Sequence, residues 1–318
     1  MRIKTIVFSL VIASIIGGSC TAILYNRSHN QNRPQSAAVS SRTVLKDADG
    51  AWLASFTKGV RTVSMAGPSR VFSEPANTTA TVTSTTWVRV YPQPFDGVID
   101  QNWLQQAQAD NEQGLPDVLQ TAMQYIDGAP KILNANGAAI AGDASYGPLK
   151  ANEKRGEGSD FNDYLGISHT YSGNDNSTDK AEHDQKGDLD CSGFQRMVWG
   201  YRNGMSLSLQ PDGMAIPRRS YQIFDAGPGI VTIANAGTQV TNFSSLQVGD
   251  LVFHDVSEND GTQIDHVGIY IGIDTNGDHR FISSRKTANG PTMGDVGGKS
   301  VLEGKGLYAT SFRGARRL

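Results

Sequence analysis

Cysteine is nearly absent from this sequence, since only Cys20 and Cys191 occur among its 318 residues. This count excludes the multi-disulfide framework that stabilises many small secreted domains. Cys20 lies in an apolar N-terminal segment, and removal of that segment would leave Cys191 as a lone thiol. A lone cysteine in an exported chain is either a small buried hydrophobe or a reactive thiol. Cys191 is therefore a candidate nucleophile.

The sequence also lacks a strong excess of either charge, because the net charge is −3 and charged residues make up 19%. The sequence has no strong excess of basic residues of the kind that binds nucleic acid, so nucleic acid is not expected as a partner. Hydrophobic residues make up 38%, which is typical of a soluble globular protein with a sizeable core. The 35 glycines indicate many turns and short strands, and no internal repeat is found.

The N-terminus has the pattern of an export signal. Arg2 and Lys4 precede an apolar run over residues 6–24. This run suits a cleaved signal peptide, and it is also near the length of about 20 residues that spans a bilayer. Residues 1–25 are therefore predicted to be a signal peptide or a membrane anchor. In both cases the remainder of the chain is exported, to the cell wall or to the outer face of the membrane.

Lipidation at Cys20 is a third fate for the N-terminal segment. Lipid-attachment sites carry an aliphatic residue three positions before the cysteine, and here that position is Gly17. The match is poor, so secretion and anchoring through residues 6–24 are favoured.

Three further regions follow along the chain. Residues 26–45 are rich in Asn, Gln, Ser and Arg, which predicts a flexible spacer. Residues 46–150 are predicted to form a β-rich and helical region whose role the sequence does not indicate. Its strand signals lie at 52–56, 60–65 and 79–91, and its helical spacing lies at 103–104 and 116–126. Residues 151–318 contain the motifs that carry chemistry.

Cys191 is predicted to begin a buried helix. Phe194, Met197, Val198 and Tyr201 recur at helical spacing, and Asp190 is a good N-cap. The start of a helix favours a thiolate over a thiol, and a thiolate is the nucleophile. Its unpaired N–H groups can also receive an oxyanion. The alternative interpretation is an ordinary capped helix with a buried cysteine.

His266 is predicted to begin a β-strand. Residues 246–253 form a turn and a strand, and residues 265–272 form a second strand with β-branched residues. A histidine at such a place is commonly a surface residue. A cysteine at a helix start followed by a histidine at a strand start is also the papain-like arrangement, in which the histidine takes the thiol proton.

Four motifs in order resemble the NlpC-type cell-wall cysteine peptidases. These motifs are Asp-Cys-Ser-Gly-Phe at 190–194, Ile-Pro-Arg-Arg-Ser-Tyr-Gln at 216–222, Gly-Asp-Leu-Val-Phe at 249–253 and His-Val-Gly-Ile-Tyr-Ile-Gly at 266–272. The resemblance covers about residues 160 to 290. It implies an α+β, papain-like fold in which the helix bearing Cys191 packs on an antiparallel sheet. It also implies hydrolysis of peptidoglycan stem peptides, often between D-glutamate and a diamino acid.

The resemblance also suggests further site residues, with one departure from the family. The family places a polar residue, most often histidine, on the strand after the catalytic histidine, and the matching residue here is Ser283. A serine hydroxyl can still orient His266. Ser192 and Asp190 are expected beside the oxyanion and substrate, and Tyr171 is expected to line the cleft. The Asp residues of loop 274–278 resemble a calcium loop, but the liganding glutamate is missing, so neither a metal nor a cofactor is expected.

Three functions remain open at this stage. The first is an exported endopeptidase in which Cys191 attacks a stem-peptide amide, His266 acts as base and Ser283 orients it. The second is an amidase or transpeptidase on the same fold, because the fold does not fix the acceptor. The third is a catalytically weak wall-binding protein, which the serine at position 283 motivates. A monomer is expected in each case.

Overall fold

The computed structural model describes residues 41–318, apart from residues 152–153, 173–175 and 258. The predicted signal or anchor, Cys20 and most of the predicted spacer therefore lie outside the described residues. The described residues belong to one compact unit. No helix within them is both long enough and apolar enough to cross a membrane.

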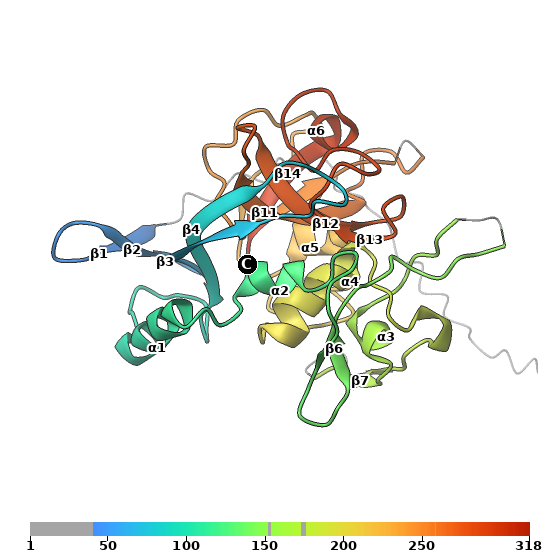
Figure 1. Ribbon diagram of the computed structural model, residues 1–318, viewed down its shortest axis with the longest axis horizontal. Helices are drawn as coiled ribbons and strands as arrows, with labels where there is room; N and C mark the ends of the chain where they lie inside the picture. The colour runs from blue at the N-terminus through green and yellow to red at the C-terminus, as the bar shows by residue number, and fades with distance from the viewer. Residues whose placement is uncertain (1–40, 152–153, 173–175, 258) are drawn as a thin grey trace, which may run out of the picture. The chain divides into compact units, whose positions relative to one another are not determined.

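An antiparallel four-stranded sheet in the order β1-β2-β3-β4 forms the N-terminal region (Figure 1). Its strands are β1 (Arg42–Lys46), β2 (Trp52–Thr57), β3 (Thr62–Phe72) and β4 (Val82–Val90). The last three confirm the strands predicted at 52–56, 60–65 and 79–91. Residues 42–45 of strand β1 belong to the segment that the sequence predicts as the spacer. Pairing with β2, for example Val44 with Ser55, supplies the hydrogen bonds that a short polar segment cannot supply alone.

Two helices follow, where the sequence predicts them. They are α1 (Gln101–Glu112) and α2 (Val118–Met123), and the short hairpin strands β5 (Ile132–Leu133) and β6 (Ala139–Ala141) come next. Asp117 caps α2, since its carboxylate accepts a hydrogen bond from the backbone N–H of Gln120. The same carboxylate accepts a bond from the backbone N–H of Val88 and pairs with Arg70 at 2.6 Å. One buried aspartate thus joins α2 to β3 and β4.

The second sheet has six antiparallel strands in the order β13-β12-β11-β10-β14-β9. Its strands are β9 (Ile230–Ile233), β10 (Leu251–His254), β11 (His266–Ile273), β12 (His279–Arg285), β13 (Gly290–Thr292) and β14 (Phe312–Arg317). Strands β10 and β11 confirm the two strands predicted around residues 246–253 and 265–272. The loop between β11 and β12 turns at Gly277, whose φ is 87°. In that loop the carboxylate of Asp274 pairs with Arg280 at 2.7 Å.

Strand β14 lies in the interior of this sheet, between β10 and β9. Its sequence contains two buried arginines, Arg316 and Arg317, which are rare inside a sheet unless they are paired. Arg317 pairs with the buried Asp250 at 2.7 Å, and Arg316 donates to the backbone carbonyls of Phe224 and Gly227. These partners satisfy the guanidinium groups, so the strand can be buried despite its charge.

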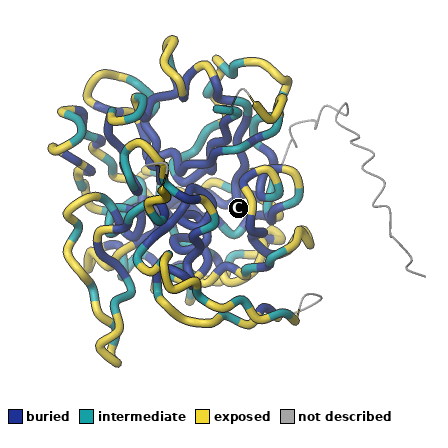
Figure 2. The backbone as a smooth tube through the Cα atoms, turned by 90° about the vertical axis from the view of Figure 1, so that its right-hand side faces the viewer, coloured by how far each residue is buried: buried dark blue, intermediate teal, exposed yellow. Residues whose placement is uncertain are grey.

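The helix that begins at Cys191 packs on strands β11 and β12. It consists of α4 (Cys191–Gln195), continued by the π-helical segment η2 (Arg196–Arg202). Phe194, Val267 and Ile282 are fully buried in a core that also contains Val88 from β4. Burying each such side chain contributes about 1.5–3 kcal/mol. In Figure 2 the buried segments gather in the interior and the exposed residues follow the outer loops.

The remaining described elements are short. They are α3 (Phe161–Leu165), β7 (His169–Thr170), β8 (Thr178–Asp179), η1 (His183–Gln185), α5 (Ser220–Ala226) and α6 (Leu307–Ser311). Helices that pack on antiparallel sheets place the protein in the α+β class, as the sequence predicts.

Candidate active site

Cys191 is the first residue of α4. The preceding Asp190 has extended backbone geometry, and its carboxylate accepts a hydrogen bond of 2.7 Å from the backbone N–H of Gly193. This is the N-cap geometry that the sequence predicts. The backbone N–H groups of Cys191 and Ser192 precede the first intrahelical bond, which runs from Phe194 to the carbonyl of Asp190. They are therefore the N–H groups at this helix start that are available for an anion.

The helix changes its winding after Gln195. Phe194, Met197 and Val198 are fully buried, as predicted, but Tyr201 is 40% exposed. A π-helical turn has i to i+5 hydrogen bonds, so residues after it rotate away from the face that α-helical spacing gives them. Tyr201 lies within η2 and stacks on Phe161, with ring centroids 5.9 Å apart. The sequence predicts Tyr201 on the buried face of the helix, and that prediction is wrong.

Cys191 and His266 line the same cleft, whose volume is about 640 Å³. The Cys191 thiol donates to the backbone carbonyl of Asp265, the residue before His266, with a Sγ–O distance of 3.7 Å. Side chains from α6, from the loop after β10 and from the end of β12 also border the cleft. Both residues are nearly buried, with 7% of Cys191 and 8% of His266 exposed.

His266 contacts Ser283 directly. The distance between His266 Nε2 and Ser283 Oγ is 3.0 Å, and Ser283 is fully buried on β12. A hydrogen bond at Nε2 leaves Nδ1 as the other ring nitrogen that can exchange a proton. The structure thus brings Cys191, His266 and Ser283 together, as the sequence predicts. His279, which lies at the other end of the same strand, pairs instead with Glu303.

The surroundings of Cys191 favour the protonated thiol. Burial raises the pKa of the Cys191 thiol to about 12, and the neighbouring Asp190 carboxylate acts in the same direction. The helix start favours the thiolate by only about 0.3–1 kcal/mol, whereas one pKa unit corresponds to about 1.4 kcal/mol. Burial also lowers the pKa of His266 well below its usual range, and His254 and Arg285 lower it further. Together these shifts favour a neutral thiol beside a neutral imidazole over the thiolate that the helix start alone predicts.

The pH dependence of Cys191 alkylation tests this neutral state. Iodoacetamide reacts with the thiolate, so with a thiol pKa of about 12 the rate should still be rising in strongly alkaline solution. We expect an increase of about tenfold per pH unit above neutrality. The rate is measured by mass spectrometry on the peptide that contains Cys191, with unfolded protein as control. A rate that is already constant from acidic to neutral pH would instead reveal a preformed thiolate.

Asp190 and Ser192 belong to a buried ionic network below the cysteine. Arg218 pairs with Asp190 at 2.8 Å and donates to Ser192 Oγ at 2.8 Å. Burial by itself raises the pKa of Asp190, but Arg218 and the backbone N–H groups outweigh it and hold that pKa below its usual range. Asp160 lies 3.6 Å from Arg218 and also pairs with Arg196. The Asp-Cys-Ser motif is therefore held in place by Arg218 of the Ile-Pro-Arg-Arg-Ser motif.

Tyr146, Tyr221 and Tyr308 line the cleft, whereas the predicted Tyr171 does not. Tyr171 is 1% exposed, and its hydroxyl accepts a 2.6 Å hydrogen bond from Arg196 Nη2, so it belongs to the buried network. Tyr146 lines the cleft beside Cys191, and burial together with Cys191 and Asp190 raises the pKa of its hydroxyl. It lies in a loop before α3, where no periodic pattern marks it in the sequence.

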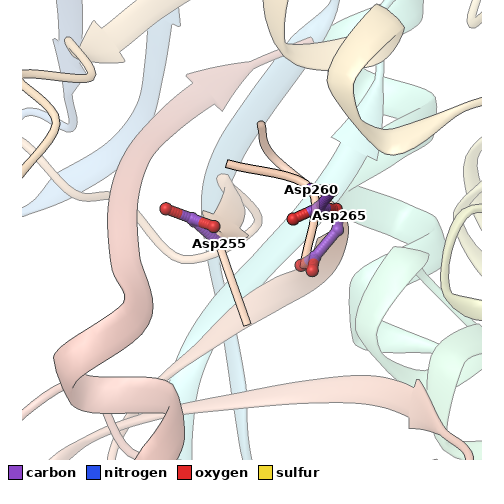
Figure 3. Close-up of side chains that lie close together, drawn as sticks. All are labelled: Asp255, Asp260 and Asp265. Atoms are coloured by element: carbon purple, nitrogen blue, oxygen red, sulfur yellow. The ribbon is translucent and has the colours of Figure 1, made fainter. Parts of the chain in front are cut away.

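Three aspartates gather beside the cleft, of which Asp260 and Asp265 line it, and no sequence motif marks the group. Asp255, Asp260 and Asp265 each offer a carboxylate oxygen, and these oxygens lie within 4.8 Å of one another (Figure 3). Asp265 accepts hydrogen bonds from the backbone N–H groups of Val256 and Ser257, which closes the loop before β11. Burial raises the pKa of Asp265, and Asp260 and Asp255 raise it further. The group makes this side of the cleft acidic.

Residues 166–301 match the model of the NlpC/P60 family. This part of the chain is an NlpC/P60 domain, which confirms the resemblance of the four motifs. The members of this family are generally cysteine peptidases of the cell wall. The matched segment contains Cys191, His266 and Ser283.

Solved structures of the same family are also similar to this chain. An NlpC/P60 family protein from Bacillus cereus is 25% identical over 41% of this chain and 32% of that chain, with a TM-score of 0.27. A protein from Staphylococcus aureus, described as similar to lipoprotein of the NLP/P60 family, is 23% identical over 48% and 38%, with a TM-score of 0.26. The chain thus spans about a third of the length of each. No curated protein matches it.

Proposed function

We propose that this protein is an exported cysteine endopeptidase that hydrolyses peptide bonds in peptidoglycan stem peptides. The observation that carries the proposal is the shared cleft of Cys191 and His266, in which His266 Nε2 lies 3.0 Å from Ser283 Oγ. A nucleophile, a base and a group that orients the base are the parts of a papain-like site. The NlpC/P60 match supplies the substrate class.

The reaction proceeds through an acyl-enzyme. His266 takes the proton of the Cys191 thiol as the sulfur attacks the amide carbonyl carbon. The N–H groups at the start of α4 stabilise the oxyanion. When the intermediate collapses, the C–N bond breaks and His266 gives its proton to the leaving amine. Water, deprotonated by His266, then hydrolyses the thioester and restores the thiol.

The remaining residues of the site serve this reaction indirectly. Ser283 orients the imidazole, and Asp190 holds the helix start together with Ser192. Tyr146, Asp260 and Asp265 line the cleft that would receive the substrate. The bond between D-glutamate and a diamino acid is our proposed target. The basic residues and the apolar run within residues 1–25 support export to the cell wall or to the outer face of the membrane.

A catalytically weak wall-binding protein is the second candidate. Two observations favour it, namely the neutral thiol–imidazole pair and the serine at the orienting position. An amidase or transpeptidase would use the same groups with a different acceptor. Analysis of the products separates these functions.

The test incubates the full chain with purified peptidoglycan and identifies the released fragments by mass, beside a Cys191→Ala variant. The endopeptidase produces stem-peptide fragments that depend on Cys191, and their masses name the bond. If both proteins sediment with intact peptidoglycan and neither releases fragments, the result instead supports the wall-binding function.

A further inference from the structure

A buried cation lies next to the residue that orients His266. Arg285 follows Ser283 by two positions on β12, so both side chains lie on the same face of the strand. Arg285 Nε donates to Ser283 Oγ at 3.0 Å, and the same oxygen lies 3.0 Å from His266 Nε2. The serine hydroxyl therefore links a guanidinium group to the imidazole. The reaction outlined above does not use this guanidinium.

Arg285 is held firmly in this position. Only 2% of the residue is exposed. Its Nη1 donates to the carbonyl of Gly298 at 2.6 Å, and its Nη2 donates to Ser300 Oγ. The guanidinium carbon lies 4.3 Å from the centroid of the Tyr308 ring, within the range of a cation–π contact. These contacts fix the direction in which Nε points toward Ser283.

The charge of Arg285 is not balanced by an ion pair. Arg280 on the same strand pairs with Asp274, and Arg317 pairs with Asp250. Within residues 41–318 as described, no carboxylate lies within ion-pair distance of Arg285, whose contacts are carbonyls, hydroxyls and aromatic rings. Glu74 and Asp295 act on its charge from beyond that distance. An unpaired buried charge acts strongly on its neighbours, because little solvent screens it.

The charge of Arg285 lies close to His266, since both side chains contact the same hydroxyl oxygen. Arg285 can only donate, so Ser283 Oγ accepts from it. The neutral His266 that can accept a proton at Nδ1 already donates its Nε2–H to that oxygen, so protonation adds a second positive charge beside Arg285 without adding a hydrogen bond to Ser283. The other groups that face His266 are His254 on β10, Tyr308 on α6, Cys191 on α4 and the adjacent Asp265. His254 is neutral, since burial lowers its pKa to about 3.

We propose that Arg285 is a positioning residue that holds the Ser283 hydroxyl against His266, and that its nearby charge disfavours the imidazolium. Cys191 then loses its proton only as it attacks the substrate, and not in the resting protein. This inference deepens the proposed function, on which its peptidase readout rests. Its second readout is the reactivity of Cys191, which requires no peptidoglycan.

The experiment compares Arg285→Met, Arg285→Lys and Ser283→Ala in the full chain. Iodoacetamide alkylation of Cys191 is followed across pH by mass spectrometry of its peptide, which separates it from Cys20. At about pH 6, Arg285→Met should be alkylated at least about fivefold faster than the parent, because the imidazolium can now pair with the thiolate. Arg285→Lys retains the charge and should stay within about twofold of the parent. An Arg280→Lys variant is the control for a change in a buried arginine of β12.

Ser283→Ala separates the two parts of the proposal. It keeps the charge of Arg285 and removes the hydroxyl, so the alkylation profile should keep its shape while peptide release falls about tenfold. Circular dichroism confirms folding of each variant. Identical alkylation profiles for the parent and Arg285→Met would overturn the proposal, as would equal acceleration by Met and Lys. If Arg285→Met does not fold, acceleration by Arg285→Lys or unchanged release by Ser283→Ala overturns it.

The outcomes distinguish this proposal from the proposed function. The alkylation profile can shift as expected in a protein that releases no stem peptides. This result supports the role of Arg285 in setting the basicity of His266 and refutes the endopeptidase function. Stem-peptide release with an alkylation profile that is insensitive to Arg285→Met gives the opposite result.

Discussion

Replacing Cys191 or His266 with alanine is expected to lower the rate of stem-peptide release by about 10⁴-fold or more. In the proposed reaction Cys191 supplies the atom that attacks the carbonyl, and no other described cysteine is present to replace it. His266 is needed because the thiol pKa of about 12 leaves almost no thiolate at neutral pH. The two losses should not add in the double variant, since the residues act as one unit. Release is measured by mass under single-turnover conditions.

His254→Phe is the matched control for the loss of a histidine. His254 lies on β10 opposite His266, with ring centroids 5.9 Å apart, and its ring packs against Phe281, Phe312 and Tyr308. A phenyl ring should fit this aromatic cluster, so the rate should fall by less than about tenfold. A loss with His254→Phe as large as with His266→Ala would contradict the assignment of His266 as the base.

Arg218→Met is expected to destabilise the fold by about 3–5 kcal/mol. Arg218 pairs with Asp190 at 2.8 Å and lies 3.6 Å from Asp160, and all three residues are buried. Methionine would leave Asp190 without its cation and Asp160 with only Arg196. The cost arises because an unpaired carboxylate in the interior loses its hydration without compensation. The free energy of unfolding is measured by urea titration.

The adjacent residue provides the control for this prediction. Arg219 has the same side chain but is exposed, so Arg219→Met should change the free energy of unfolding by less than about 0.5 kcal/mol. Similar values for Arg218→Met and Arg219→Met would mean that the buried ion pair is not required for the stability of the helix start.

The placement of Cys191 and His266 in the candidate site could be predicted from sequence because its signals are local. The cap at Asp190, the apolar spacing after Cys191 and the β-branched strand after His266 each lie within a few residues. Tyr146 could not be predicted, because its place depends on how the loop before α3 passes the cleft. The burial of Tyr201 was predicted wrongly because a π-helical turn cannot be recognised from hydrophobic spacing.

Strand β14 also escaped prediction, for a different reason. Its sequence, Phe-Arg-Gly-Ala-Arg-Arg, lacks the alternation of polar and apolar residues that marks a strand. Arg316 and Arg317 are buried only because backbone carbonyls and Asp250 receive their guanidinium groups. The sequence contains these charges, but their partners are distant along the chain and become visible only in three dimensions.

The position of β14 has a consequence for the order in which the protein can fold. Residues 312–317 separate β10 from β9, so they complete a sheet whose other strands are synthesised earlier. The carbonyl of Leu318 also accepts hydrogen bonds from the backbone N–H groups of Arg61 and Thr62, which are among the first described residues. After His266 has been synthesised, and until the ribosome reaches residue 312, the chain contains Cys191 and His266. The sheet still lacks the strand that joins β10 to β9. The cleft can therefore reach its final form only in a chain whose synthesis has passed these residues.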